Sequence, residues 1–270
     1  ETIQAAKAIA AQDREAYLDW MIEVEQIDIK ESGCYLFQLD GITMVNDIIQ
    51  AQSIEAENVT LVCAKVKNTR LELDSWKAIN ITFHYCIFEN TRIKSTQKES
   101  TFVGCSFYER DTNTGNTHLN LEEASNFTKC TFKNILSEEH LLDLSNAAVE
   151  HCLFSDCFVH EALILTLSNG TLIDSEFIRC RCDSILSVDS CSFLSVDNSS
   201  VIRCSFSHCE MNGKANYSSS VIIAFDSAIK DCHFEQCASK NINPYHGYIY
   251  GYIVCLYQSK ESNNTFSGCS

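Results

Sequence analysis

The chain has 270 residues, of which 36 are acidic and 20 are basic, so its formal net charge is −16 at pH 7. Phosphate groups repel such a surface, which argues against nucleic acid or an anionic membrane as the main partner. No apolar run approaches the roughly 18 residues that a transmembrane helix needs, and we expect no membrane span. A chain of this length can bury one sizeable core or two small ones.

Residues 1–30 are predicted to form an α-helical cap. Within residues 2–26, an Ala-rich start is followed by apolar side chains at spacings of three and four, which is typical of an amphipathic helix. These side chains are Tyr17, Trp20, Met21 and Val24. Such a helix would cover the first strands of the structure that follows and protect their edge. Binding a partner is the alternative role.

A nine-residue pattern occurs four times between Val149 and Cys237. Each copy has an apolar residue, a small residue three positions later that is usually Cys, a Phe two positions after that, and a final Cys. The central phenylalanines are Phe154, Phe177, Phe206 and Phe234, at steps of 23, 29 and 28 residues. A variable repeat of about 20 to 30 residues predicts a solenoid.

Each copy predicts strands whose Cys and Phe face inward. These two residues are two positions apart and therefore lie on one face of a strand, and the final Cys turns inward after a corner. A second inward strand precedes each copy, as in Leu142-x-Leu144. Its corner residue is Asn146, Asn169, Asn198 or Asp226 in successive copies. Stacked coils would place these residues about 4.8 Å apart, where side-chain amides can form a hydrogen-bonded ladder.

Three further copies, in residues 74–135, lack the final Cys. Their central phenylalanines are Phe88, Phe107 and Phe132, and Thr91, Arg110 and Ile135 stand where that Cys is expected. Two insertions interrupt the later copies, at 181–191, with a strand-like stretch at 185–188, and at 240–252. Insertions in solenoids fall on loops and often form the binding face.

Over residues 60–270 the pattern resembles right-handed parallel β-helix proteins, the pectin-lyase-like architecture. The resemblance implies an all-β fold, a single right-handed parallel β-helix solenoid over residues 31–270 behind the helical cap. Pentapeptide-repeat proteins, a related solenoid, are the near alternative. Residues 64–71 have their five-residue step, but the sequence does not sustain it.

Sixteen cysteines need an explanation. Most fall at inward positions, where a thiol behaves as a small hydrophobe, so we expect reduced, structural cysteines, which favour a reducing compartment. Seven glycosylation-type sequons favour secretion or effector-type delivery instead, although Asn-x-Ser/Thr is also natural turn chemistry. The sequon residues are Asn58, Asn80, Asn126, Asn169, Asn198, Asn216 and Asn263.

The second insertion carries the candidate binding residues. They are Tyr245, His246, Tyr248, Tyr250 and Tyr252. Tyrosine gives large contact area at low entropic cost, so this loop could bind a protein or a glycan partner. Alternatively, the tyrosines only cover the edge of the last coil.

No catalytic, metal or cofactor site is expected. The outward column Lys129, His151, Asp174, Arg203 and Asp231 is interpreted as alternating ion pairs, with an acid/base cluster for polysaccharide cleavage as the alternative. The β-helix resemblance implies calcium-binding aspartates or paired carboxylates, yet Asp189, Asp197 and Asp226 form no recognisable catalytic motif. The Cys-x4-Cys spacing does not match a zinc knuckle.

The sequence therefore predicts a non-catalytic interaction protein of effector, adhesin or structural type, which presents a lateral β-helix face and the Tyr-rich loop to its partner. The alternative is a carbohydrate-active enzyme of the pectin-lyase-like class, a polysaccharide lyase or glycoside hydrolase. A third hypothesis, an acidic DNA mimic that inhibits a DNA-binding enzyme, requires a continuous acidic stripe. The sequence leaves the oligomeric state open.

Overall fold

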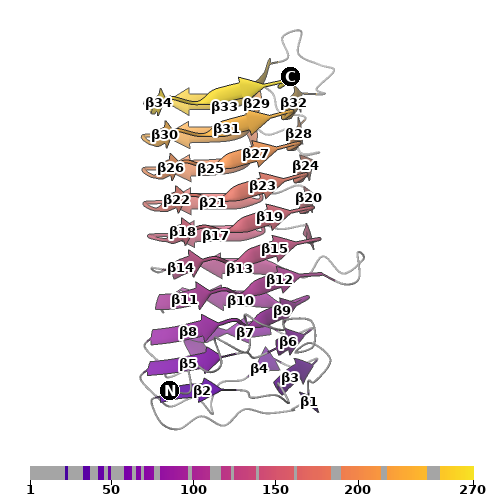
Figure 1. The fold of residues 1–270 in the computed structure, drawn as a ribbon, viewed down its shortest axis with the longest axis vertical. Coiled ribbons are helices and arrows are strands. Elements are labelled where there is room, and N and C mark those ends of the chain that lie inside the picture. Colours follow the sequence, from indigo (N-terminus) through magenta and orange to yellow (C-terminus); the bar gives the residue numbers. More distant parts are fainter. Residues whose placement is uncertain are drawn as a thin grey trace.

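The computed structural model describes short strands between residues 22 and 75 and then residues 80–270. The gaps in this second part are 97–98, 110–116, 123–124, 138–139, 161–162, 184–189, 214–217 and 242–249. Side chains are described for most of these residues from Leu71 onward. The described chain is an all-β parallel solenoid, in which coils stack along one axis (Figure 1).

The strands stack into four sheets of 11, 10, 9 and 5 strands, and every strand pairs in parallel with its equivalents in the neighbouring coils. One coil contains β17 (Leu142–Ser145), β18 (Ala148–Glu150), β19 (Leu153–Ser155) and β20 (Phe158–His160), one strand in each sheet. The next coil begins with β21 (Leu165–Ser168), which pairs with β17. The coils that contribute to all four sheets thus have four sides.

The remaining strands follow the same plan. The 11-stranded sheet also contains β1 (Ile22–Glu23), β3 (Ile42–Val45), β6 (Lys65–Lys67), β9 (Ile87–Glu89), β12 (Ser106–Tyr108), β15 (Thr131–Lys133), β23 (Glu176–Ile178), β27 (Ser205–Ser207), β31 (His233–Glu235) and β35 (Thr265–Ser267). The ten-stranded sheet also contains β2 (Gly33–Leu36), β5 (Asn58–Val62), β8 (Asn80–His84), β11 (Glu99–Val103), β14 (Ser125–Thr128), β22 (Thr171–Ile173), β26 (Ser200–Ile202), β30 (Ala228–Lys230) and β34 (Lys260–Ser262).

The two smaller sheets are completed in the same way. The nine-stranded sheet also contains β4 (Ile48–Ile49), β7 (Arg70–Glu72), β10 (Arg92–Ser95), β13 (His118–Leu121), β25 (Ser190–Asp197), β29 (Ser218–Phe225) and β33 (Tyr250–Tyr257). The five-stranded sheet also contains β16 (Leu136–Ser137), β24 (Arg181–Asp183), β28 (Glu210–Gly213) and β32 (Ala238–Asn241). A short 3₁₀ helix spans Leu73–Ser75.

From β17 onward, three corners of each coil use a left-handed backbone residue, spaced five residues apart. In the coil that starts at β17 these residues are Asn146, His151 and Asp156, with φ of 51°, 53° and 55°. The same three corners recur in the next coils, with a backbone hydrogen bond such as Asn146 N to Ser168 O at 2.8 Å linking successive coils. The five-residue step is therefore sustained in the backbone, contrary to the expectation from the sequence.

The five-residue spacing of the corners is not visible in the sequence, because the corner positions hold different residue types, including Asn, Asp, Arg, His and Gln. What these corners share is a backbone conformation, which Asn and Asp adopt more readily than most residues. One step of the predicted amide ladder is present: Asn198 Nδ2 donates to Asn169 Oδ1 at 2.6 Å.

Phenylalanine rings form continuous columns inside the solenoid. Phe154 and Phe177, from β19 and β23, are fully buried and stack with ring centroids 4.5 Å apart and planes 3° apart. The inward residues of one strand therefore contact the same residue type in the next coil. The column in the 11-stranded sheet consists of Phe88, Phe107, Phe132, Phe154, Phe177, Phe206, Phe234 and Phe266.

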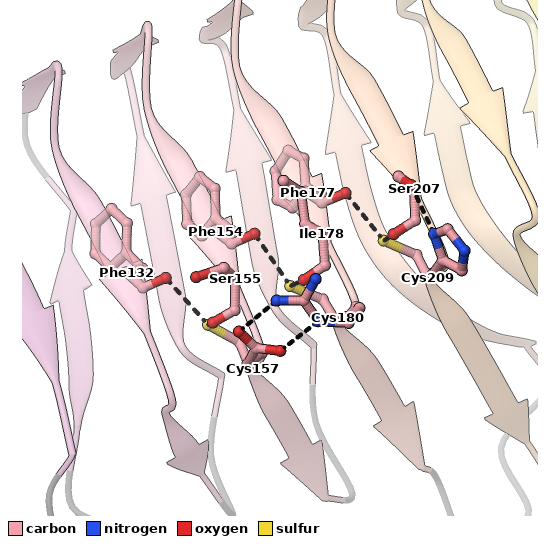
Figure 2. A network of polar contacts seen from close by, with 12 residues as sticks. Phe132, Phe154, Ser155, Cys157, Phe177, Ile178, Cys180, Ser207 and Cys209 are labelled. Carbon is pink, nitrogen blue, oxygen red and sulfur yellow. Dashed lines mark hydrogen bonds and ion pairs between the residues drawn. The ribbon is translucent and has the colours of Figure 1, made fainter.

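The cysteines form columns beside the phenylalanines and connect successive coils. The Cys157 thiol donates to the carbonyl oxygen of Phe132 in the coil below at 3.5 Å, and Cys180 does the same to Phe154 (Figure 2). All thirteen cysteines that the structure describes are free, and eleven are buried. Burial raises the pKa of the Cys105 and Cys130 thiols, so these side chains are neutral, hydrogen-bonded core residues.

Several expectations fall on the N-terminal part and on the insertions. The predicted helix over 2–26 lies outside the described residues, except for Ile22 and Glu23, which form β1 and pair with β3. The strand-like stretch at 185–188 also lies outside them. In the upstream copies Thr91 and Ile135 are buried at the position of the missing Cys, whereas Arg110 is not among the described residues.

The Phe column predicts that replacing two nearby phenylalanines by alanine lowers the free energy of unfolding by very different amounts. We expect Phe154→Ala to lower the free energy of unfolding by about 3 to 5 kcal/mol, because it leaves a cavity in a packed core. Phe158→Ala removes an outward, half-buried ring and should cost about 1 kcal/mol. Urea unfolding of both variants measures the difference, and equal losses would show that Phe154 does not lie in a shared core.

Candidate recognition surface

Exposed aromatic side chains gather in the last two coils. Among the described residues, the large apolar side chains that are exposed are Phe225 on β29, Tyr252 and Tyr257 on β33, and Phe266 on β35, with exposed fractions of 37, 40, 43 and 49%. We call these four residues the C-terminal aromatic surface. In the coils below, the aromatic residues of the core are buried.

Two of the four residues lie on the outside of the nine-stranded sheet. Phe225 follows the buried inward residue Ala224 and therefore points outward. It pairs with Tyr257 in the next coil, and the two rings stack at 4.9 Å with planes 10° apart. In the coils below, the same column holds Ser168 and Asp197. The outer face thus changes from polar to aromatic at the last two coils.

The other two residues stand at inward positions of the last coil. Phe266 stacks on Phe234 with centroids 5.0 Å apart, yet Phe234 is fully buried whereas Phe266 is 49% exposed. Tyr252 pairs with the buried Ser220 of β29. Val254 and Leu256, also on β33, are only partly buried against the core. The last described coil therefore contains inward apolar side chains of the kind that fill the core below.

The same coil places polar side chains at core positions on its ten-stranded sheet. Glu261 occupies the column that holds Val201 and Ile229 in the coils below, and it is exposed where they are fully buried. Asn264 stands where the coil below has Cys232, accepts a hydrogen bond from the Cys232 N–H at 2.9 Å, and donates to the carbonyl oxygen of Ile229 at 3.2 Å. On this side, the last coil therefore has polar side chains at positions that hold core residues in the coils below.

The predicted Tyr-rich loop meets this surface only in part. Tyr245, His246 and Tyr248 lie outside the described residues, and Tyr250 is the first residue of β33, with a side chain that is not described. Of the predicted loop residues, only Tyr252 has a described side chain, and it belongs to the C-terminal aromatic surface.

Phe225, Tyr257 and Phe266 were not among the predicted binding residues. For Phe225 and Tyr257 a signal existed: each comes directly after an inward residue of its strand, and alternation along a strand places it outside. Phe266 belongs to the repeated pattern and is exposed only because its coil is the last one described.

The lateral column contains ion pairs between neighbouring coils. Arg203 donates from Nε and Nη2 to the two carboxylate oxygens of Asp174, at 2.7 and 2.8 Å. At a second corner, Arg179 binds Asp156 in the same bidentate way. Hydrogen bonds from these arginines hold the pKa of both carboxyl groups below the usual value. Both carboxylates are therefore ionised ion-pair partners, as predicted for Asp174 and Arg203.

Asp231, the predicted second neighbour of Arg203, occupies the equivalent corner of the next coil and interacts with Arg203 through its charge. Its carboxylate accepts a hydrogen bond from Asn263 Nδ2 at 2.9 Å and lies 3.7 Å from Lys230 Nζ. Asp197 and Asp226 are exposed, and Asp189 lies outside the described residues. Within the described part of the chain, no group of three His, Cys, Asp or Glu side chains could hold a metal ion.

The five-stranded sheet carries a third ion pair. Arg181 lies over the ring of Phe158, 5.5 Å from its centroid, and binds both oxygens of Asp183 at 2.8 and 2.6 Å. Asn212 donates to Asp183 Oδ1 from the next coil at 2.9 Å. Burial raises the pKa of Asp183, but hydrogen bonds from Arg181 and Asn212 lower it by more, so the pKa lies below its ordinary value.

The fold defines the class of this protein, a parallel β-solenoid. No protein-family model matches the chain, and no curated protein shows significant sequence similarity to it. In the part of the chain that the structure describes, no helix is both long and apolar enough to span a membrane.

The Asp183 contacts predict part of the acid sensitivity of the fold. A carboxyl group whose pKa is lower in the folded than in the unfolded protein stabilises the fold above its unfolded pKa, about 3.9, and loses that contribution as pH falls through the folded value. Asp183→Asn should therefore be less stable at about pH 7 and lose less stability between about pH 6 and pH 3. Asn212→Ala should produce a smaller change in the same direction. Unfolding curves parallel to wild type at both pH values would contradict this assignment.

Proposed function

We propose that this protein is a non-catalytic binding protein whose recognition surface is the C-terminal aromatic surface together with the neighbouring residues Tyr245, His246, Tyr248 and Tyr250. The partner is a protein or a glycan. The observation that carries the proposal is the stacked, exposed pair Phe225 and Tyr257 on the outside of the nine-stranded sheet, in a column that holds Ser168 and Asp197 in the coils below. Adjacent exposed aromatic groups mark interaction sites more often than single ones do.

The backbone under these residues favours recognition. β29 and β33 are eight-residue strands held in register with β25 below them. Side chains on such strands occupy fixed positions, so binding orders little new structure and the entropic cost of association stays small. Tyr and Phe then supply a large apolar contact area, with a hydroxyl group on Tyr257 for a polar contact.

The lateral face supports binding rather than catalysis. A hydrolase or lyase needs a carboxyl group poised to exchange a proton, or carboxylates that hold a metal ion. The carboxylates of Asp156 and Asp174 are instead held in bidentate ion pairs with arginines. We infer that these pairs connect successive coils.

Arrays of immobilised glycans and of peptides test the proposal. Wild-type protein should bind a subset of one array, and Tyr257→Ala with Phe266→Ala should weaken that binding at least about tenfold, since buried aromatic anchors dominate such interfaces. Phe158→Ala, which removes an aromatic side chain from another face, should bind like wild type.

Two outcomes would contradict the proposal. One is binding that survives in the aromatic variant but is lost in Asp174→Ala with Arg203→Ala, which would move the site to the lateral face. The other is turnover of a polysaccharide that disappears when a surface carboxylate is replaced, which would favour the carbohydrate-active enzyme.

A further inference from the structure

We infer that the partner that contacts Phe225 is a basic protein segment, and that an arginine of this segment packs against the Phe225 ring and pairs with Asp197 and Asp226. This inference rests on the proposed function and names the class of partner. It follows from the place of Phe225 on the solenoid, from the two acidic side chains beside it, and from an arginine contact of the same kind elsewhere in the chain.

Phe225 belongs to the lateral face of the solenoid. Its strand, β29, pairs with β25 on one side and with β33 on the other. The ring is 37% exposed although Tyr257 stacks on one of its two faces. On the other side the same column holds Asp197, which has no ring to cover the second face. A flat cationic group can therefore reach this second face of Phe225 from the side of the solenoid.

Two carboxylates lie close to Phe225. Asp197 is its partner in the neighbouring coil, so the Cα atoms of these two residues lie about 4.8 Å apart. Asp226 follows Phe225 in the chain, at a corner where φ is 46°. Both acidic side chains are exposed, and neither forms an ion pair with another residue that the structure describes. The ring is thus bordered by negative charge that the described part of the chain does not compensate.

Three aspartates on other faces show how this chain compensates such carboxylates. Asp156, Asp174 and Asp183 each accept two hydrogen bonds from one arginine, through both carboxylate oxygens. Charge-assisted hydrogen bonds in this bidentate geometry are among the strongest that proteins form. The carboxylates beside Phe225 receive no such arginine from the described chain, so a partner can supply one.

The five-stranded sheet contains the complete arrangement. The Arg181 guanidinium lies over the ring of Phe158, 5.5 Å from its centroid, and binds both oxygens of Asp183. Ring, guanidinium and carboxylate come from two neighbouring coils, since Phe158 pairs with Arg181 in register. The surface at Phe225 has a ring in one coil and a carboxylate in the neighbouring coil, and it lacks only the guanidinium.

Arginine fits this surface better than lysine does. Its planar guanidinium can stack on an aromatic ring while it donates two parallel hydrogen bonds to a carboxylate, whereas the lysine ammonium acts as a point charge. The net charge of −16 adds a long-range attraction for a basic segment. A neutral glycan would leave the charge of both carboxylates uncompensated, and we therefore expect a basic protein segment.

Four labelled octapeptides test the inference. They alternate serine with arginine, lysine, citrulline or glutamate, and each is titrated with the full chain by fluorescence anisotropy. The arginine peptide should bind most tightly, and the lysine peptide about twofold to fivefold more weakly, because an ammonium cannot stack and donate in the same way. The citrulline peptide, which keeps the planar shape but carries no charge, should bind at least about tenfold more weakly than the arginine peptide.

Two double variants separate the site from the total charge. Asp197→Asn with Asp226→Asn should weaken binding of the arginine peptide at least about tenfold, and Asn suits the left-handed corner at position 226. Glu176→Gln with Glu235→Gln removes the same charge from exposed outward positions of β23 and β31, and it should weaken binding by less than about twofold. Phe225→Leu, which keeps an apolar side chain without a ring, should make the arginine and lysine peptides bind equally.

An arginine peptide that binds no more tightly than the lysine or citrulline peptide, equal losses in the two double variants, or no binding of the arginine peptide would overturn the inference. If the peptides fail while a glycan binds and is lost with Tyr257→Ala and Phe266→Ala, the binding function stands and the basic partner is wrong. If neither array nor peptide shows binding, both proposals fall.

Discussion

The structure depends on one constraint, the stacking of inward residues in register from coil to coil. Phe154 must lie directly on Phe177, and the thiol of Cys180 must reach the carbonyl oxygen of Phe154. A strand displaced by one residue would turn both its Phe and its Cys outward. The left-handed corners oppose this displacement, since they fix a five-residue step on the two sides that carry the ten-stranded and the 11-stranded sheets.

The same constraint decides where the chain can vary. The connection from the five-stranded to the nine-stranded sheet varies in length, from four residues between β20 and β21 to eight between β32 and β33, while the left-handed corners keep their step. Outward positions are free of the constraint and carry ion pairs in the middle coils and aromatic residues in the last two. The proposed recognition surface lies in these last two coils.

Much of the fold was predictable from the sequence, because the Cys and Phe of each copy are core residues in every described coil below the last one. The parallel solenoid, the buried Phe column and the Asn169–Asn198 contact all followed from spacing. The four-sided coil could not be predicted in this way, because its corners share a backbone conformation but no common residue type. The pectin-lyase-like architecture is not confirmed by any family match, and the sustained five-residue step is a feature shared with the pentapeptide alternative.

The candidate site was harder to predict, because exposure at the end of a solenoid depends on which coil is last. Phe234 and Phe266 stand in equivalent copies of one pattern, yet one is core and the other surface. The loop residues Tyr245, His246 and Tyr248 remain a prediction. Glu261 was informative only after its register with Ile229 was known.

Site-resolved alkylation of the thiols in the folded protein tests the stacked core most directly. The account predicts that, among the described cysteines, N-ethylmaleimide modifies the half-buried Cys255 and Cys269 first. Cys130, Cys157 and Cys209, in the columns between coils, should react only as fast as the whole protein unfolds. Modification of these three cysteines at the rate of Cys255, measured by mass spectrometry of tryptic peptides, would show that the thiols do not lie in a shared core.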